Sequence, residues 1–116
     1  GVVLSDFVNL SQGVRIYTVS DDYSGAAMTN PTVPQQFTNV TVAPVLLGKH
    51  VIIGSGSVVL PGVNLGEGVA VGALSLVNRS LDPWGIYAGS PVRRLKPRRK
   101  DLLDAEQRYL NSESCL

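Results

Sequence analysis

The feature that most constrains this chain is a six-residue repeat, which runs from residue 45 to residue 80 without an insertion or deletion. A helix cannot place this period on one face, because six residues at about 3.6 per turn leave successive aliphatic side chains pointing in different directions. A strand can, since its side chains alternate with a period of two. The third position of each frame is aliphatic and should face inward: Leu47, Ile53, Val59, Leu65, Val71 and Val77.

Glycine marks the places where the chain must bend. It follows the third position in most frames, with Leu60 and Asn78 as departures. A straight strand over the whole repeat would run about 120 Å at ~3.3 Å per residue, so the chain must turn once per frame, where glycine tolerates unusual dihedrals. The same frame recurs over residues 2–16, which gives nine hexads in all. If three hexads close one triangular coil, the sequence predicts about three stacked coils of a parallel β-helix.

Two segments fall outside the repeat. Residues 19–44 interrupt it with a turn-prone stretch, and long loops inside compact domains are usually functional. Apolar residues at 102, 103, 109 and 110 predict a short helix over 101–110. The predicted organisation is therefore a β-helix domain over residues 1–96, with an inserted loop at 19–44, and a C-terminal helical tail over residues 97–116.

Composition and charge exclude several classes of function. The net charge is +1, and six of the ten basic residues lie within residues 93–100 without the aromatic residues that stack on bases, so we expect no nucleic-acid partner. A single histidine cannot supply a three-histidine zinc site, so we expect no metal and disfavour a metal-dependent anhydrase. The longest uncharged stretch, residues 23–48, contains three prolines and predicts no membrane span. The lone Cys115 excludes an intramolecular disulfide and favours a cytoplasmic location.

Three motifs, together with the hexads, carry a resemblance to a known family. They are VIIGSGSVVLPGV at residues 51–63, VAVGALSLVNRSL at residues 69–81 and YAGSPVRRLK at residues 87–96. With them the chain resembles the left-handed parallel β-helix acyltransferases of the hexapeptide-repeat superfamily, closest to the galactoside, maltose and O-antigen sugar acetyltransferases. The resemblance implies an all-β solenoid with an inserted loop and a short C-terminal helix, a homotrimer, and acetyl-CoA as co-substrate.

The resemblance also implies a binding site for acetyl-CoA. Small residues would line the slot for pantetheine, a turn would meet the adenine end, and basic residues would meet the phosphates, as charge-assisted contacts favour. For Ala73 and Ser75 an equally good interpretation is that a coil corner requires small residues. The implied residues are Gly72, Ala73, Ser75 and Asn78 along the slot, Gly89, Ser90 and Pro91 in the turn, and Arg93, Arg94 and Lys96 at the phosphates.

The inserted loop carries the candidate catalytic residues. Sugar acetyltransferases of this superfamily often have S-H-D-Y-S here, with the His as general base, whereas this chain reads S-D-D-Y-S-G at residues 20–25. A hydroxyl acceptor needs a matched base, but an amine attacks a thioester readily once it loses a proton. The loop therefore favours an amino-sugar acceptor, with Asp21 as first choice for base or ammonium anchor and Asp22 as second. Tyr23 and Asn30 are the candidate sugar contacts.

Several alternatives stay open at the level of sequence. The loop is similar to that of enzymes that N-acetylate nucleotide-linked amino sugars such as GDP-perosamine for O-antigen synthesis. Asp21 and Asp22 could instead be turn carboxylates that cap loop amides. His50, expected to face outward at a corner, could be the base of an O-acetyltransferase, supplied by a neighbouring subunit. A non-catalytic trimeric β-helix module is a further alternative.

Overall fold

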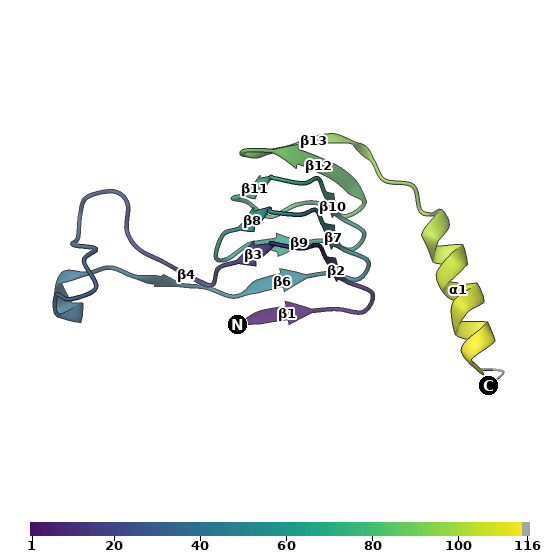
Figure 1. Cartoon of the computed structure of the whole chain (residues 1–116), viewed down its shortest axis with the longest axis horizontal. Helices are drawn as coiled ribbons and strands as arrows, with labels where there is room; N and C mark the ends of the chain where they lie inside the picture. Colours follow the sequence, from purple (N-terminus) through teal and green to yellow (C-terminus); the bar gives the residue numbers. More distant parts are fainter. Residues whose placement is uncertain (115–116) are drawn as a thin grey trace.

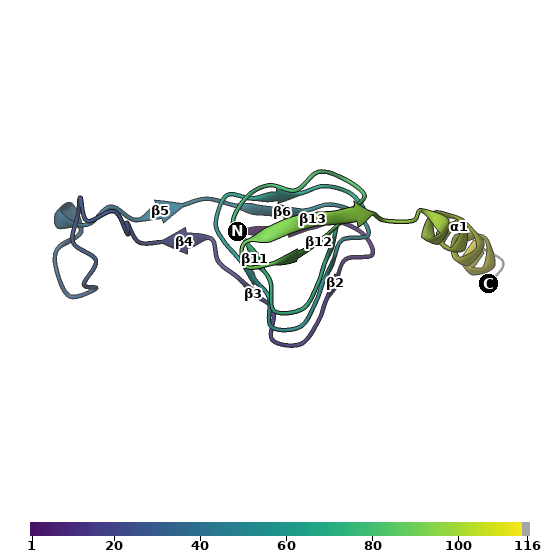
Figure 2. The ribbon, with the colours of Figure 1, turned by 90° about the horizontal axis from the view of Figure 1, so that it is seen from above.

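The computed structural model describes residues 1–114, so Cys115 and Leu116 lie outside the described residues. The chain turns through short strands that stack as three-sided coils (Figure 2). The first coil is formed by three strands, β1 (Val2–Leu4), β2 (Asn9–Leu10) and β3 (Arg15–Ile16). The second coil has β6 (Val45–Leu47), β7 (Ile52–Ile53) and β8 (Val58–Val59). The third has β9 (Asn64–Leu65), β10 (Ala70–Val71) and β11 (Leu76–Val77).

The coils stack strand upon strand in parallel sheets. Leu47 pairs with Leu65 of the next coil, which is eighteen residues or three hexads further along the chain. The first coil keeps this alignment although residues 19–44 intervene, since Leu4 pairs with Leu47 and Leu10 with Ile53. The expectation of mostly β structure in parallel sheets is thereby confirmed, and the insertion leaves the frame intact.

The predicted inward positions form the core. All six aliphatic third positions of the main repeat are buried, with at most 4% of their surface exposed. Burial of each such side chain stabilises the fold by about 1.5–3 kcal/mol. The corresponding residues of the first coil have no layer beneath them within the described chain, and Leu4 is 51% exposed.

The insertion forms a projecting arm. Strand β4 (Val19–Ser20) pairs antiparallel with β5 (Thr41–Val42), and a short 3-10 helix, η1 (Gln35–Phe37), lies further out. Figures 1 and 2 show the arm extending away from the coils on the side opposite the C-terminal helix. Tyr23 in this arm is 91% exposed.

The C-terminal segment caps the coils and then returns alongside them. Strand β12 (Gly85–Gly89) stacks on β10 and turns back antiparallel into β13 (Val92–Pro97). Helix α1 (Asp101–Ser114) then runs beside the coils toward the end of the stack at which β1 lies (Figure 1). This confirms the predicted short C-terminal helix, which extends beyond residue 110. No helix in residues 1–114 combines the length and apolar character needed to cross a bilayer.

The three corners of the coil carry different rows of residues, seen from above in Figure 2. At the helix corner, beside α1, the row is Phe7, His50, Gly68 and Trp84. At the glycine corner, between β2 and β3 and their equivalents, the row is Ser11, Gly54 and Gly72. At the arm corner, where the insertion leaves the coil, the row is Tyr17, Leu60 and Asn78.

Candidate functional site

The glycine corner presents a flat wall of backbone. A Cβ atom on Gly54 would lie 2.5 Å from the backbone nitrogen of Ala73, and one on Gly72 would lie 3.1 Å from the Cβ of Ala88. Only glycine allows successive coils to approach so closely at Gly54. Ala73 is exposed on this wall and Gly72 is partly exposed. The corner therefore leaves Ala73 and Gly72 open to solvent beside closely packed backbone, and a contact of these residues with pantetheine stays a prediction.

Ser75 lies at this corner but its side chain points into the coil. It is 3% exposed, and its hydroxyl donates to the carbonyl of Gly72 at 2.8 Å and accepts from the Gly89 N–H at 3.1 Å. The neighbouring Ser57 hydroxyl also donates to Gly72 O, and it accepts from the Ser75 N–H. The Ser57 and Ser75 hydroxyls therefore belong to one hydrogen-bond network inside the coil, centred on the Gly72 carbonyl. A contact between Ser75 and the co-substrate stays a prediction.

The turn between β12 and β13 lies next to the glycine corner. The Gly89 N–H is held by Ser75, and Gly89 has a φ of 112°, which favours glycine. Ser90 and Pro91 are exposed in this turn. The predicted phosphate contacts Arg93, Arg94 and Lys96 follow on β13, and all three are exposed. The structure thus gathers most of the residues predicted for the co-substrate along one edge, from Gly72 to the basic strand.

Asn78 is the exception among those residues. It follows β11, whereas Ser75 precedes it, so Asn78 lies at the arm corner and not at the glycine corner. Ser11 was not singled out by sequence reasoning, although it begins the row that Gly54 and Gly72 continue. Alignment of the upstream hexads with the main repeat could have identified it, because Leu10, Ile53 and Val71 pair in register.

The arm brings several predicted acceptor residues together. One depression, about 510 Å³ in volume, is lined by Asp21, Asp22 and Tyr23. A second, about 390 Å³, is lined by Asp21 and Asn30 among others. A third, about 340 Å³, lies where the arm joins the coil and again includes Asp21. Asp21 therefore borders all three depressions around the arm.

The two neighbouring carboxylates have different surroundings. Asp22 Oδ1 accepts the Ser24 N–H at 2.8 Å, and Oδ2 accepts the Asn39 side-chain amide at 3.4 Å. Hydrogen bonds from Ser24, first from its side chain and then from its backbone, lower the pKa of Asp22, and Asn39 adds to this effect. Asp22 thus has the turn-capping geometry that the sequence left open as an alternative. Within residues 1–114 no hydrogen bond engages the exposed Asp21 carboxylate, which leaves it accessible to a ligand.

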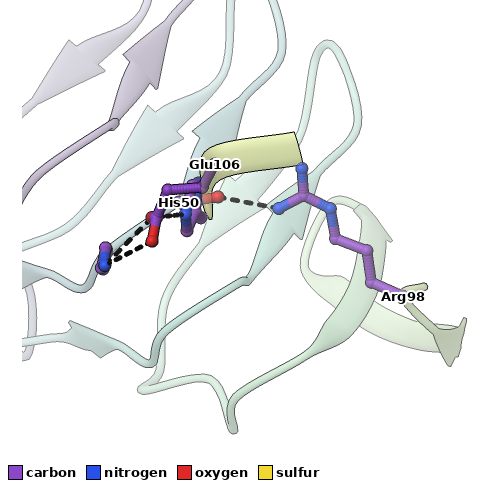
Figure 3. Close-up of polar contacts among 4 residues, drawn as sticks. His50, Arg98 and Glu106 are labelled. Atoms are coloured by element: carbon purple, nitrogen blue, oxygen red, sulfur yellow. Dashed lines mark hydrogen bonds and ion pairs between the residues drawn. The ribbon is translucent and has the colours of Figure 1, made fainter. Parts of the chain in front are cut away.

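His50 lies at the helix corner, where its side chain contacts α1. Its Nε2 is 2.5 Å from Oε1 of Glu106, and its ring stacks on Phe7 with centroids 5.1 Å apart. The side chain is 11% exposed. Arg98 donates to the backbone carbonyl of His50 at 2.7 Å, and Figure 3 shows this guanidinium and Glu106 converging on the same corner. Within one chain, the structure therefore separates His50 from Asp21.

The described residues 1–114 contain no cluster of three or more side chains that could hold a metal ion.

Burial lowers the pKa of Arg98, whose guanidinium still remains protonated at neutral pH. The chemically distinctive regions are thus the glycine corner with its basic strand and the acidic arm.

No family model matches the chain. It is 46% identical over 105 residues to dTDP-4-amino-4,6-dideoxy-D-glucose acyltransferase of Escherichia coli, and the match covers 90% of this chain and 55% of that enzyme. Among solved structures it is similar to AntD, an N-acyltransferase from Bacillus cereus, in complex with dTDP and 3-hydroxybutyryl-CoA. That comparison gives a TM-score of 0.94 at 46% identity and covers 98% of this chain and 61% of AntD.

A more distant structure has the same fold. A maltose O-acetyltransferase from Clostridium difficile 630 matches with a TM-score of 0.71 and 27% identity, over 85% of this chain and 49% of that one. Close homologues of the chain are thus acyltransferases, and its structural neighbours include sugar acetyltransferases. The chain spans between about half and three fifths of the length of these relatives.

Proposed function

We propose that this protein is an N-acyltransferase that moves an acetyl group from acetyl-CoA to the amine of a nucleotide-linked amino sugar. The observation that carries the proposal is the 46% identity to AntD over nearly the whole chain, arm included. AntD has been solved with dTDP and 3-hydroxybutyryl-CoA, and a serine variant of it with dTDP-4-amino-4,6-dideoxyglucose and coenzyme A. The flat glycine corner and the exposed basic strand support the same donor, because they offer main-chain and cationic contacts along one edge.

A spacing argument supports Asp21 as the acceptor-side residue. AntD has been solved as variants of a serine and of an aspartate that lies ten residues further along its chain. In this chain only Ser11 and Asp21 form a serine–aspartate pair with that order and spacing. Ser11 stands in the glycine-corner row and Asp21 borders the arm depressions. We therefore assign Ser11 to the donor side of the site and Asp21 to the acceptor side.

The proposed chemistry needs no covalent enzyme intermediate. Asp21 holds the sugar ammonium and accepts one of its protons, which frees the nitrogen lone pair. The nitrogen then forms a bond to the carbonyl carbon of the thioester while the carbon–sulfur bond breaks. The second amine proton passes to the thiolate as the amide forms, so coenzyme A leaves as the free thiol, and Asp21 releases the first proton to solvent. Tyr23 and Asn30, which border depressions with Asp21, are the proposed sugar contacts.

The proposal extends to the domain organisation and the assembly of the protein. We infer a left-handed parallel β-helix solenoid over residues 1–96, with the arm inserted at 19–44, and a helical tail over 97–116. Ser11 and Asp21 lie at different corners of one coil, so a site that uses both needs a neighbouring copy, which supports a homotrimer. We also infer a cytoplasmic location and a role in O-antigen synthesis. The dTDP-linked amino sugar of the relatives favours a dTDP-linked acceptor over the GDP-perosamine type.

The competing function is O-acetylation of a sugar hydroxyl with His50 as base. The maltose O-acetyltransferase with the same fold keeps this alternative open. The contacts of His50 with Glu106 and Phe7 argue against it, because a general base must reach the acceptor proton. The slot residues and the arm would be shared by both reactions, so only the acceptor distinguishes them.

A free-thiol assay tests the proposal directly. Acetyl-CoA binding is first measured by calorimetry, and turnover is then measured with a dTDP-linked amino sugar, its GDP-linked counterpart and the matched hydroxyl sugar. Thiol release with the amine and not with the hydroxyl is the expected result. Turnover of the hydroxyl sugar would instead show that the protein is an O-acetyltransferase. If acetyl-CoA does not bind, the protein is a non-catalytic module.

A further inference from the structure

The arm corner departs from the glycine rule of the repeat. Tyr17, Leu60 and Asn78 occupy, in successive coils, the position directly after the inward aliphatic residue. In the second and third coils this position is glycine at the other two corners: Gly48 and Gly66 beside α1, and Gly54 and Gly72 at the glycine corner. The backbone here is as regular as elsewhere, since Tyr17 N–H donates to Val59 O at 2.9 Å and Leu60 N–H donates to Val77 O at 3.0 Å. The bend itself therefore does not require large side chains, and their presence calls for another explanation.

Tyr17 and Leu60 face the depression that joins the coil to the arm. This depression has a volume of about 340 Å³, and one side of it is formed by apolar groups of the coil while the Asp21 carboxylate borders it from the arm. Tyr17 is 46% exposed and Leu60 is partly exposed, so both present surface to a ligand. The complete lining is Tyr17, Val19, Ser20, Asp21, Tyr23, Val58, Leu60 and Pro61.

An apolar wall beside a carboxylate selects for a particular arrangement of groups on a sugar. In a 4-amino-4,6-dideoxyhexose the amine and the C6 methyl group stand on adjacent ring carbons. The ammonium can pair with the carboxylate while the methyl group contacts the apolar wall. A 6-hydroxyl placed against the Leu60 side chain and the face of the Tyr17 ring would lose its water without gaining a hydrogen-bond partner there, which is unfavourable.

We propose that Tyr17 and Leu60 form a specificity wall for the acceptor, and that this wall selects an amino sugar in which a methyl group lies next to the reacting amine. The inference rests on the proposed function and deepens it, because it assigns the recognition of one ring substituent to two named side chains. Asp21 binds the amine and the wall binds the methyl group.

The test compares two acceptors that differ in one hydroxyl group. The purified protein is assayed with nucleotide-linked 4-amino-4,6-dideoxyglucose and with the 4-amino-4-deoxyglucose analogue, which keeps the 6-hydroxyl, and kcat/KM is measured for each. We expect a preference of about 10- to 100-fold for the deoxy sugar, the range that an apolar pocket reaches against an added hydroxyl. Leu60→Asn should reduce this preference by about tenfold, mainly through better use of the hydroxyl sugar.

Two further variants keep the result interpretable. Leu60→Gly restores the glycine rule of the repeat, so it should fold, and it should also weaken the preference. Leu46→Asn changes a more exposed leucine on another face of the coil, away from the depression, and should leave the preference unchanged. The specificity wall is contradicted if the unaltered protein uses both sugars equally, or if the preference is unchanged in both Leu60 variants. The proposed function stands in either case. If neither sugar is acylated, the proposed function fails, and the wall fails with it.

Discussion

The Nε2 atom of His50 lies 2.5 Å from Oε1 of Glu106, and this contact ties helix α1 to the second coil (Figure 3). Lys49 reinforces the tie through its own ion pair with Glu106 at 3.0 Å. Contacts with the other coils come from the same segment. The ring of Tyr109 meets Phe7 of the first coil edge-on, and Arg98 donates to the carbonyl of Gly68 in the third. The C-terminal tail therefore acts as a strap across the stacked coils.

Replacement of Glu106 by Gln tests the strap. Glu106→Gln removes the charge that Lys49 and His50 share while it keeps the size of the side chain, so we expect a lower Tm and earlier loss of helical signal by circular dichroism. Because the strap lies away from the arm, kcat/KM should change by less than about tenfold, below the effect of removing a general base. Arg108→Gln, a change of charge at an exposed position in the middle of the same helix, is the matched control and should leave the Tm close to its original value.

Acid should loosen the strap through Glu106. The hydrogen bond from Lys49, and to a lesser degree that from His50, lowers the pKa of this carboxyl below its ordinary value of 4.5. A carboxyl with a lowered folded-state pKa contributes stability that is present above its ordinary pKa and is lost as the pH falls through the lowered value. The stability difference between the unaltered protein and Glu106→Gln should therefore shrink below about pH 4.5, as measured by urea unfolding across that range. A constant difference would show that the charge of Glu106 is not what stabilises the contact.

Variants of His50 separate a structural histidine from a catalytic one. His50 has a φ of 64°, a conformation that Asn tolerates better than Ala. We expect His50→Asn to keep kcat within about tenfold and to lower the Tm, and His50→Ala to lower the Tm further. A fall in kcat of about 10²-fold or more in a well-folded His50→Asn protein would restore His50 as the base.

Removal of the Ser75 hydroxyl should affect stability more than binding. Ser75→Ala removes the hydroxyl that accepts the Gly89 N–H and donates to the Gly72 carbonyl, and a hydrogen bond of this kind contributes about 0.5–1.5 kcal/mol. We expect this loss in denaturant unfolding, together with a change in the Kd for acetyl-CoA of less than about tenfold. Ser5→Ala, at an exposed serine of the first coil, should show neither effect. A large rise in Kd at unchanged stability would instead indicate direct contact with the co-substrate.

Much of the fold could be predicted because the hexad period is a local pattern. Leu47 and Leu65 are inward in the sequence pattern and are buried in the structure, and they pair in register three hexads apart. The period also predicts where the chain bends. It does not say which corner a residue occupies, since that depends on how three hexads close into one coil. For this reason Asn78 was grouped with Ser75, although the two lie at opposite ends of β11.

Contacts between segments that are far apart in the sequence could not be predicted from such a local pattern. His50 and Glu106 are 56 residues apart, and nothing in either local sequence predicts that α1 returns along the helix corner. Arg98 lies within the basic run of residues 93–100, and nothing in that run predicts that its guanidinium donates to the carbonyls of His50 and Gly68. Such pairings depend on the direction in which the chain leaves β13, which no periodicity encodes.

The two neighbouring aspartates of the arm should differ in their effect on catalysis. Asp21→Asn removes the group proposed to hold the amine and take its proton, so we expect kcat to fall by about 10²- to 10⁴-fold at unchanged Tm. Asp22→Asn retains one oxygen that can accept the Ser24 N–H, so it should alter mainly KM. The measurement is steady-state kinetics with the amino-sugar acceptor, with acetyl-CoA binding as the check that the donor side is intact. Nearly full turnover in Asp21→Asn would reduce Asp21 to a turn residue, and a larger loss in Asp22→Asn would transfer the role to its neighbour.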